Sequence, residues 1–206
     1  MNENQYFVWG WQHESYRLIR GQEPSFELSS MEMSCCRKDF AAASLVLRPK
    51  ERSVILVENR AEFSLRGPLP IIRGEVDCPE LPGAILFRTE TLPDDDKVSK
   101  ADALAGWGSE TVAGWLPTQL FLYIPVPEDT APGCYEGFIK FYAHRMFEDE
   151  ILVEKIPFSV QVKDVVLPSG DDRKFHLVIW QHPCNIARQY EVPLFSERHF
   201  ELLEEY

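Results

Sequence analysis

The chain has 206 residues, of which 45% are hydrophobic and 12% aromatic, and its formal net charge is −12. This length allows one large domain, or one domain and a piece of another, with enough apolar side chains for a core. The negative charge repels phosphate backbones and anionic membrane surfaces, so neither nucleic acid nor membrane is an expected partner. Fifteen prolines against eleven glycines favour a loop-rich β protein over a helical one.

The cysteine pattern and the first residues of the chain indicate the cellular compartment. The five cysteines are Cys35, Cys36, Cys78, Cys134 and Cys184. Their number is odd, two are adjacent and no CxxC occurs, so they do not form a disulfide framework. The adjacent pair could be a metal or redox site, but a structural role is favoured because no further ligands cluster with it. No signal peptide and no apolar run long enough to span a bilayer are present. We therefore expect a reduced cytoplasmic setting, with no metal and no cofactor.

Short β-type runs begin the chain. They cover Tyr6–Trp11, Tyr16–Arg20 and Phe26–Leu28, with polar breaks and Gly21 between them. Trp9 and Trp11 alternate with a period of two. Such a pair could stack on sugar rings, but large apolar residues at this spacing are more often core.

Further short strands follow, each bounded by proline, glycine or charge. They are Ala43–Leu47, Ser53–Val57, Phe63–Leu65, Ile71–Val76, Ala84–Arg88 and Gln119–Ile124. Many short strands at regular spacing predict a β-sandwich or a barrel.

Residues 92–117 interrupt this pattern and are predicted to form a long insertion without secondary structure, of the kind that is usually functional or mobile. The acidic run Asp94–Asp96 could bind a cation, although a solvated charge run is the commoner explanation. Trp107 and Trp115 have no strand period to explain them. They are candidates for sugar contacts, or for packing against the core or a neighbouring domain.

Residues 125–168 give the clearest pattern. Pro132-Gly133 is a tight-turn dipeptide. The alternation of Tyr135–Phe141 and of Ile156–Val162 predicts an antiparallel hairpin with one buried and one wet face.

After Pro168 the sequence changes character. Residues 169–173 form a polar linker, and 174–180 form a near-continuous apolar strand typical of parallel sheets. Ser196 is a good N-cap for a helix over 196–206, with Phe200, Leu203 and Tyr206 on one face. That helix has no C-terminal cap, so we expect residues 174–206 to be the first βα unit of a truncated α/β domain. The alternative is a small appendage docked on the sandwich.

Motifs of common enzymes are absent: no GxSxG, HExxH, P-loop or dinucleotide fingerprint occurs. His182 and Cys184 offer two possible metal ligands only. Adjacent carboxylates occur at Asp149-Glu150 and Asp171-Asp172, and a glycosidase needs two carboxyl groups flanking the glycosidic bond. Asp149-Glu150 lies in the predicted hairpin turn, however, where acidic residues are ordinarily solvated.

Six stretches of the chain form a recognisable set: Arg37–Ala42, Ala101–Leu104, the turn Pro132-Gly-x-Tyr-x-Gly137, Asp164–Pro168, Phe175–Pro183 and Ser196–Phe200. Together they resemble the N-terminal region of glycoside hydrolase family 123 and its bacterial relatives. The resemblance is most specific at Phe175–Pro183, whereas the turn is shared by many bacterial sandwich modules.

The resemblance implies an antiparallel β-sandwich of the immunoglobulin or fibronectin-III type over residues 1–168, followed by the start of a TIM-type barrel. It implies β-N-acetylhexosaminidase-type chemistry, with the substrate acetamido group as nucleophile and an adjacent Asp and Glu on a barrel strand that lies beyond Tyr206. The chain would thus hold no catalytic residue. Trp180, Gln181 and His182 would lie at the C-terminal end of the first barrel strand and line the pocket.

The sequence therefore predicts a non-catalytic sandwich domain of a glycoside hydrolase-like protein, whose main partner is its own C-terminal barrel. Two alternatives stay open. One is a free-standing carbohydrate-binding module that uses Trp107, Trp115 or the N-terminal tryptophans. The other is a protein-interaction sandwich with no role in sugar binding.

Overall fold

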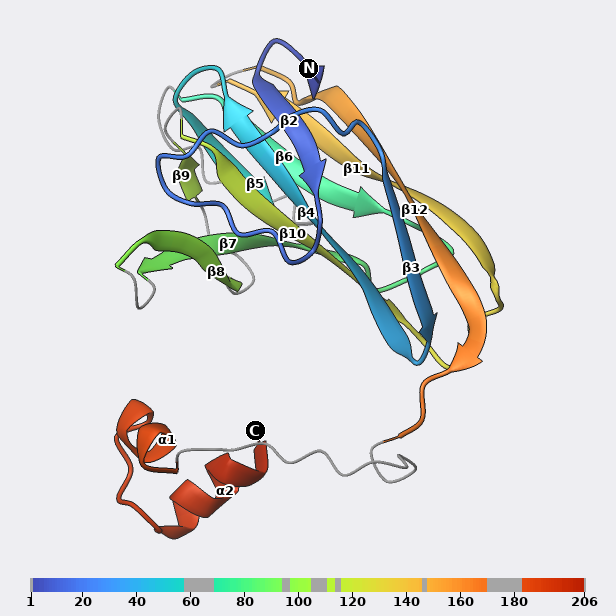
Figure 1. The fold of residues 1–206 in the computed structure, drawn as a ribbon. Helices are drawn as coiled ribbons and strands as arrows, with labels where there is room; N and C mark the ends of the chain where they lie inside the picture. Colours follow the sequence, from blue (N-terminus) through green and yellow to red (C-terminus); the bar gives the residue numbers. More distant parts are fainter. Residues whose placement is uncertain are drawn as a thin grey trace. The chain divides into compact units, whose positions relative to one another are not determined.

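The structure is a computed structural model that describes residues 2–57, 69–93, 97–104, 111–113, 116–145, 148–169 and 183–205. The chain divides into two compact units, Met1–Leu167 and Pro168–Tyr206 (Figure 1). The expected strand at 63–65 and the expected barrel strand at 174–180 lie outside the described residues. No helix within the described ranges is long and apolar enough to cross a membrane.

The first unit is mainly β and consists of two six-stranded sheets. Sheet one has the order β1-β2-β4-β10-β7-β8 and is antiparallel throughout. Its strands are β1 (Asn2–Glu3), β2 (Phe7–Gln12), β4 (Asp39–Pro49), β7 (Ile85–Pro93), β8 (Ser99–Leu104) and β10 (Thr118–Val126).

Sheet two has the order β3-β12-β11-β6-β5-β9, and its β3–β12 and β5–β6 pairs are parallel. Its strands are β3 (Met31–Arg37), β5 (Ser53–Val57), β6 (Ile71–Asp77), β9 (Thr111–Ala113), β11 (Gly133–His144) and β12 (Ile151–Val166). One buried cluster joins inward side chains of both sheets, such as Leu45 and Leu122 of sheet one with Ile139 and Val160 of sheet two. The expectation of a mainly β, sandwich-like fold with two sheets is confirmed.

The predicted hairpin is confirmed as β11 and β12. The two strands pair in antiparallel register, with Tyr135 opposite Val160 and Ile139 opposite Ile156. The inward residues are buried, and the alternate residues of β12 reach the surface. The period-two pattern therefore identified both the pairing and the buried face.

The predicted strands at 16–20 and 26–28 are wrong. Residues 13–30, here called the strap, cross the outer face of sheet one without forming a strand. The buried Gln119 holds them: the Leu18 N–H donates to its Oε1 at 2.8 Å, and its Nε2 donates to the Tyr16 carbonyl at 2.8 Å. Apolar side chains of this segment, such as Leu18 and Phe26, belong to a small buried cluster on that face of the sheet. These contacts explain why the segment looks β-like in sequence.

Residues 92–117 are also more regular than expected. β7 continues through Pro93, β8 pairs with it as a ribbon, and β9 pairs with β5. The outer half of β7 is exposed on both faces, so its residues carry no apolar alternation. β3 was missed as well, although Met31, Met33 and Cys35 alternate along its inward face.

The second unit contains α1 (Pro183–Gln189) and α2 (Glu197–Glu205). The predicted cap is confirmed, because the His199 N–H donates to the Ser196 Oγ at 3.2 Å. The buried residues of this helix are His199 and Leu202, whereas Phe200 of the predicted apolar face is 52% exposed. Phe200 stacks on Phe195 at 6.3 Å between ring centroids. These residues flank the first turn as a hydrophobic staple, which fixes where the chain enters the helix.

A substitution at Gly137 tests the packing between β11 and β12. A Cβ at this position would lie 2.6 Å from the Phe158 Cε2 and 3.1 Å from the Cys78 Cβ. Phe158 is buried and cannot turn away freely, so Gly137→Ala should lower the free energy of unfolding by about 1–3 kcal/mol. Gly133→Ala is the control, because the nearest atom lies at 3.9 Å. Equal urea midpoints for the two variants would contradict this packing.

A substitution at Gln119 tests whether this side chain holds the strap in place. Gln119→Met keeps the shape of the side chain but leaves the Leu18 N–H and the Tyr16 carbonyl without partners, at a cost of about 2–3 kcal/mol. Hydrogen exchange at the Leu18 amide should accelerate accordingly. Gln161→Met is the control, since the Gln161 amide makes only exposed or partly buried contacts. Unchanged exchange at Leu18 would show that Gln119 does not hold the strap.

Candidate functional site

The residues predicted to contact substrate or sugar lie outside the described residues. They are Trp107, Trp115, Trp180, Gln181 and His182, and the acidic run Asp94–Asp96 lies outside as well. Their roles therefore stay predictions.

The N-terminal tryptophans belong to the core, as the spacing favoured. Trp9 is 5% exposed and Trp11 is fully buried. The Trp9 Nε1–H donates to a Glu154 carboxylate oxygen, and the Trp11 Nε1–H donates to the Pro157 carbonyl, each at 3.2 Å. Neither ring presents a face to solvent, so this pair is not a sugar platform.

Glu150 of the adjacent acid pair has a structural partner. Arg73 holds it through two parallel hydrogen bonds, Nε to Oε1 at 2.9 Å and Nη2 to Oε2 at 2.8 Å. The same guanidinium donates to Glu75 at 2.6 Å and lies 4.4 Å from the centroid of the Tyr142 ring. The hydrogen bonding that Arg73 donates to Glu150 is the largest of the effects that raise the pKa of Arg73. Glu150 therefore anchors the β11–β12 connection to β6, a role that explains its charge without catalysis.

The cysteines show no metal centre. Among the described residues, no group of three or more His, Cys, Asp or Glu could hold a metal ion. Cys35 is buried while Cys36 is partly exposed, as neighbours on a strand point to opposite faces. Burial raises the pKa of the Cys35 thiol to about 11, which suppresses the reactive thiolate.

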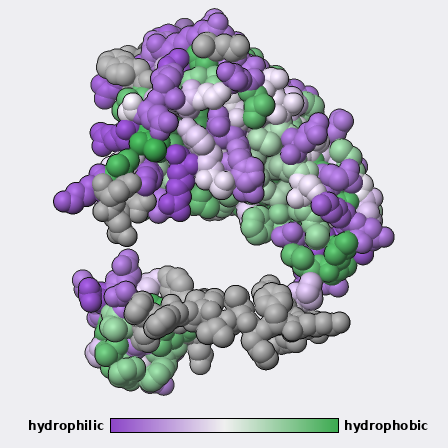
Figure 2. Space-filling view, viewed as in Figure 1, coloured by the Kyte–Doolittle hydropathy of each residue, from purple (hydrophilic) through white to green (hydrophobic). Residues whose placement is uncertain are grey.

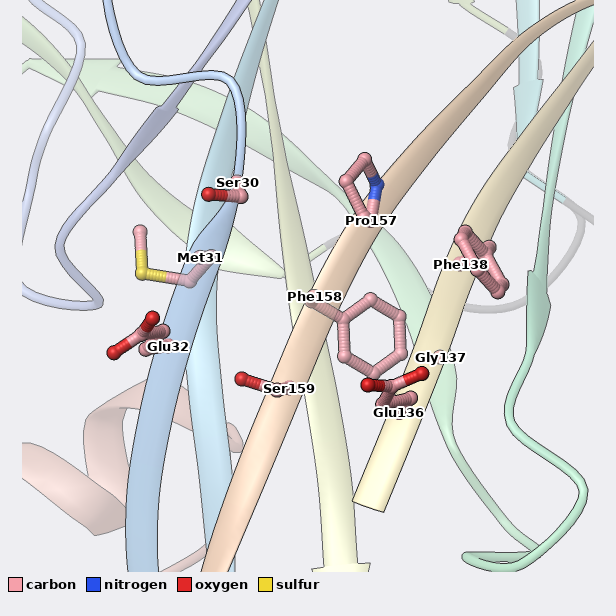
Figure 3. A pocket seen from close by; sticks show the side chains of 9 residues that line it. All are labelled: Ser30, Met31, Glu32, Glu136, Gly137, Phe138, Pro157, Phe158 and Ser159. Atoms are coloured by element: carbon pink, nitrogen blue, oxygen red, sulfur yellow. The ribbon is translucent and has the colours of Figure 1, made fainter. Parts of the chain in front are cut away.

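A hollow of about 200 Å³ lies on the outer face of sheet two, here called the groove (Figure 3). Three adjacent strands form it. In one row across the strands, Ser159 of β12 pairs with Glu32 of β3 on one side and Glu136 of β11 on the other. In the next row, Pro157 pairs with Phe138, and Ser30 precedes β3. The central strand carries small side chains between larger ones, and this difference in size creates the hollow.

The groove combines carboxylates, hydroxyls and ring surfaces. Figure 3 shows Ser159 between Glu32 and Glu136, with the Phe138 and Pro157 rings beside them. Within the described part of the chain, neither carboxylate has an ion-pair or hydrogen-bond partner. The Lys155 ammonium lies 3.6 Å from the centroid of the Phe138 ring. Sequence reasoning missed these residues, because each looks like an ordinary outward position of its strand.

A second hollow of about 250 Å³ follows the connection from Val76 to Ala84. Its one carboxylate, Asp77, is paired with the Lys140 ammonium at 2.6 Å. It therefore offers fewer free polar groups than the groove. Figure 2 shows hydrophilic residues over much of the visible face, with hydrophobic residues between them.

Comparison with known proteins identifies one structural relative of interest. No known family and no curated protein matches the sequence. A family 123 glycoside hydrolase from Clostridium perfringens, described in terms of glycolipid glycan hydrolysis, matches 95% of this chain with a TM-score of 0.65 and 15% identity. The chain spans only 34% of that protein. At this identity the match concerns the fold alone.

Two further solved structures are less similar. A PapD-like domain of human CEP192 has 8% identity and a TM-score of 0.37, and covers 80% of this chain and 92% of that one. A protein of unknown function from Porphyromonas gingivalis has 13% identity and a TM-score of 0.35, and covers 76% and 48%. Both TM-scores are too low to define a shared fold.

Alkylation distinguishes the buried from the exposed cysteines. At pH 8 iodoacetamide should modify Cys134 and Cys184, which are exposed, long before Cys35. Folding raises the pKa of Cys35 from 9.0 to about 11. Between these two pH values the native state therefore keeps a proton that the unfolded state loses. The stability from this thiol is present below pH 9 and is lost as the pH rises toward 11. Mass spectrometry that found Cys35 modified as fast as Cys134 at pH 8 would contradict its burial.

Proposed function

We propose that this chain is the N-terminal β-sandwich region of a glycoside hydrolase-like protein similar to family 123. The supporting observation is the fold match to the Clostridium perfringens enzyme. Its coverage of 95% of the chain exceeds what residues 1–167 alone could provide, so the match extends into the second unit. The sequence resemblance at Phe175–Pro183 points the same way. In this proposal the sandwich is of the immunoglobulin or fibronectin-III type, and residues 174–206 open a TIM-type barrel.

The proposed role of the sandwich is to support a catalytic barrel, its main partner, rather than to catalyse. The acid pair within the first unit supports this, since Arg73 engages both oxygens of Glu150. Trp180, Gln181 and His182 keep their proposed place at the pocket of that barrel. The five cysteines, free where the structure describes them, support the proposed reducing, cytoplasmic setting.

A second candidate function is carbohydrate binding by the sandwich itself. The groove on sheet two favours it, because hydroxyls, carboxylates and ring surfaces meet there. The burial of Trp9 and Trp11 removes the N-terminal tryptophans from this candidate, whereas Trp107 and Trp115 stay in it as proposals. No particular observation favours a protein-interaction role.

An activity assay tests the first proposal. The 206-residue chain should release no nitrophenol from p-nitrophenyl N-acetyl-β-D-glucosaminide above background. Glu150→Gln should instead lower the free energy of unfolding, by about 1–3 kcal/mol, since it breaks the paired hydrogen bonds to the partly buried Arg73. Asp149→Asn, at the exposed neighbour, is the control. Hydrolysis by the parent chain that either substitution abolished would overturn the non-catalytic role.

A further inference from the structure

The register of the paired strands determines the shape of the groove. Pro157 and Ser159 lie on β12, the middle of the three strands, and Phe138 and Glu136 stand opposite them on β11. Glu32 forms the opposite wall from β3. Because β12 is held between two neighbours for most of its length, the backbones that carry these side chains keep their spacing. The strand register therefore fixes which residues line the groove.

The lining restricts the charge of a ligand. Glu32 and Glu136 have no cationic partner within the described residues, although many other acids of this unit do, such as Asp77 and Glu150. An anionic ligand would meet two uncompensated carboxylates on a chain of net charge −12. The groove therefore disfavours phosphates, sulfates and acidic sugars.

The lining also disfavours a single shared metal ion. Glu32 and Glu136 lie on strands separated by β12, so their backbones are about 10 Å apart. A calcium ion takes six to eight oxygen ligands at about 2.3–2.6 Å, and two carboxylates this far apart and a serine hydroxyl do not supply them. A neutral ligand rich in hydroxyls fits better. Its O–H groups can donate to both carboxylates, and its C–H surface can lie against the Pro157 ring.

We propose that the groove between Glu32 and Glu136 binds a neutral saccharide unit, with Ser159 at its floor. In this arrangement the carboxylates accept hydrogen bonds from sugar hydroxyls, and Lys155 stays over the Phe138 ring at the rim. The choice of a saccharide among polyhydroxy ligands rests on the proposed function, because the structural relative acts on a glycan. The site lies within the first unit and needs no residue of a catalytic barrel.

Nuclear magnetic resonance titration of the ¹⁵N-labelled 206-residue chain tests the proposal. Lactose is the neutral probe and sialyllactose its anionic counterpart. Lactose should shift the amides of Glu32, Glu136 and Ser159 at millimolar concentration, and sialyllactose should bind at least several-fold more weakly. Glu32→Gln and Glu136→Gln should each weaken lactose binding about fivefold, since each replaces a charged acceptor by a neutral one. Glu148→Gln is the charge-matched control on the exposed β11–β12 connection.

Four results would each overturn the proposal. The first is no lactose shift at these amides up to solubility. The second is lactose binding that survives in the Glu32→Gln, Glu136→Gln double variant. The third is equal binding of lactose and sialyllactose. The fourth is stronger shifts with N-acetyl-lysine amide than with lactose, which would make the groove a site for basic side chains. None of these results bears on the supporting role of the sandwich, and hydrolysis by the chain alone would overturn that role without affecting the groove.

Discussion

The close contact of the Phe158 ring with Gly137 sets the arrangement of the first unit. The two residues are directly opposite in the β11–β12 register, and the ring occupies the space that a side chain at 137 would fill. The ring also meets Trp11 of sheet one edge to face, with 6.4 Å between ring centroids and 82° between ring planes. The Trp11 Nε1–H also donates to the carbonyl of Pro157, which is the residue before Phe158 on β12. One aromatic ring thus fixes the hairpin register and links the two sheets.

This interior contact also determines the outer surface. Successive residues of a strand face opposite sides, so a slip of one residue in β12 would place Ser159 inside and Phe158 outside. The row of Glu32, Ser159 and Glu136 exists only in the register that buries Phe158. The candidate binding site is therefore a consequence of core packing, and its geometry should be as stable as the hairpin.

The sequence predicted those parts of the fold that local patterns encode. The hairpin, β2, β5, β6 and the Ser196 cap were readable, because alternation and capping act between residues close in the chain. The strap was not, since its hydrogen-bond partners lie far along the chain, among them the side chain of Gln119, 101 residues from Leu18. The groove was not readable for a similar reason, because residues near 31, 137 and 158 meet only once the strands pair. In α2 the staple leaves Phe200 outside and His199 within, against the simple apolar pattern.

The strap affects whether strands of other chains can pair with the β8 edge of sheet one. Its backbone pairs with the outer strand β8: the Arg20 N–H donates to the Ser99 carbonyl, and the Ala101 N–H donates to the Leu18 carbonyl, at 2.9 and 2.8 Å. Unpaired edge strands can pair with strands of other chains, which leads to aggregation. Here the protein covers the Ser99–Ala101 part of that edge of sheet one with its own backbone. A foreign strand could pair with this part of β8 only after the strap had detached, so its protection depends on a segment that itself has no regular secondary structure.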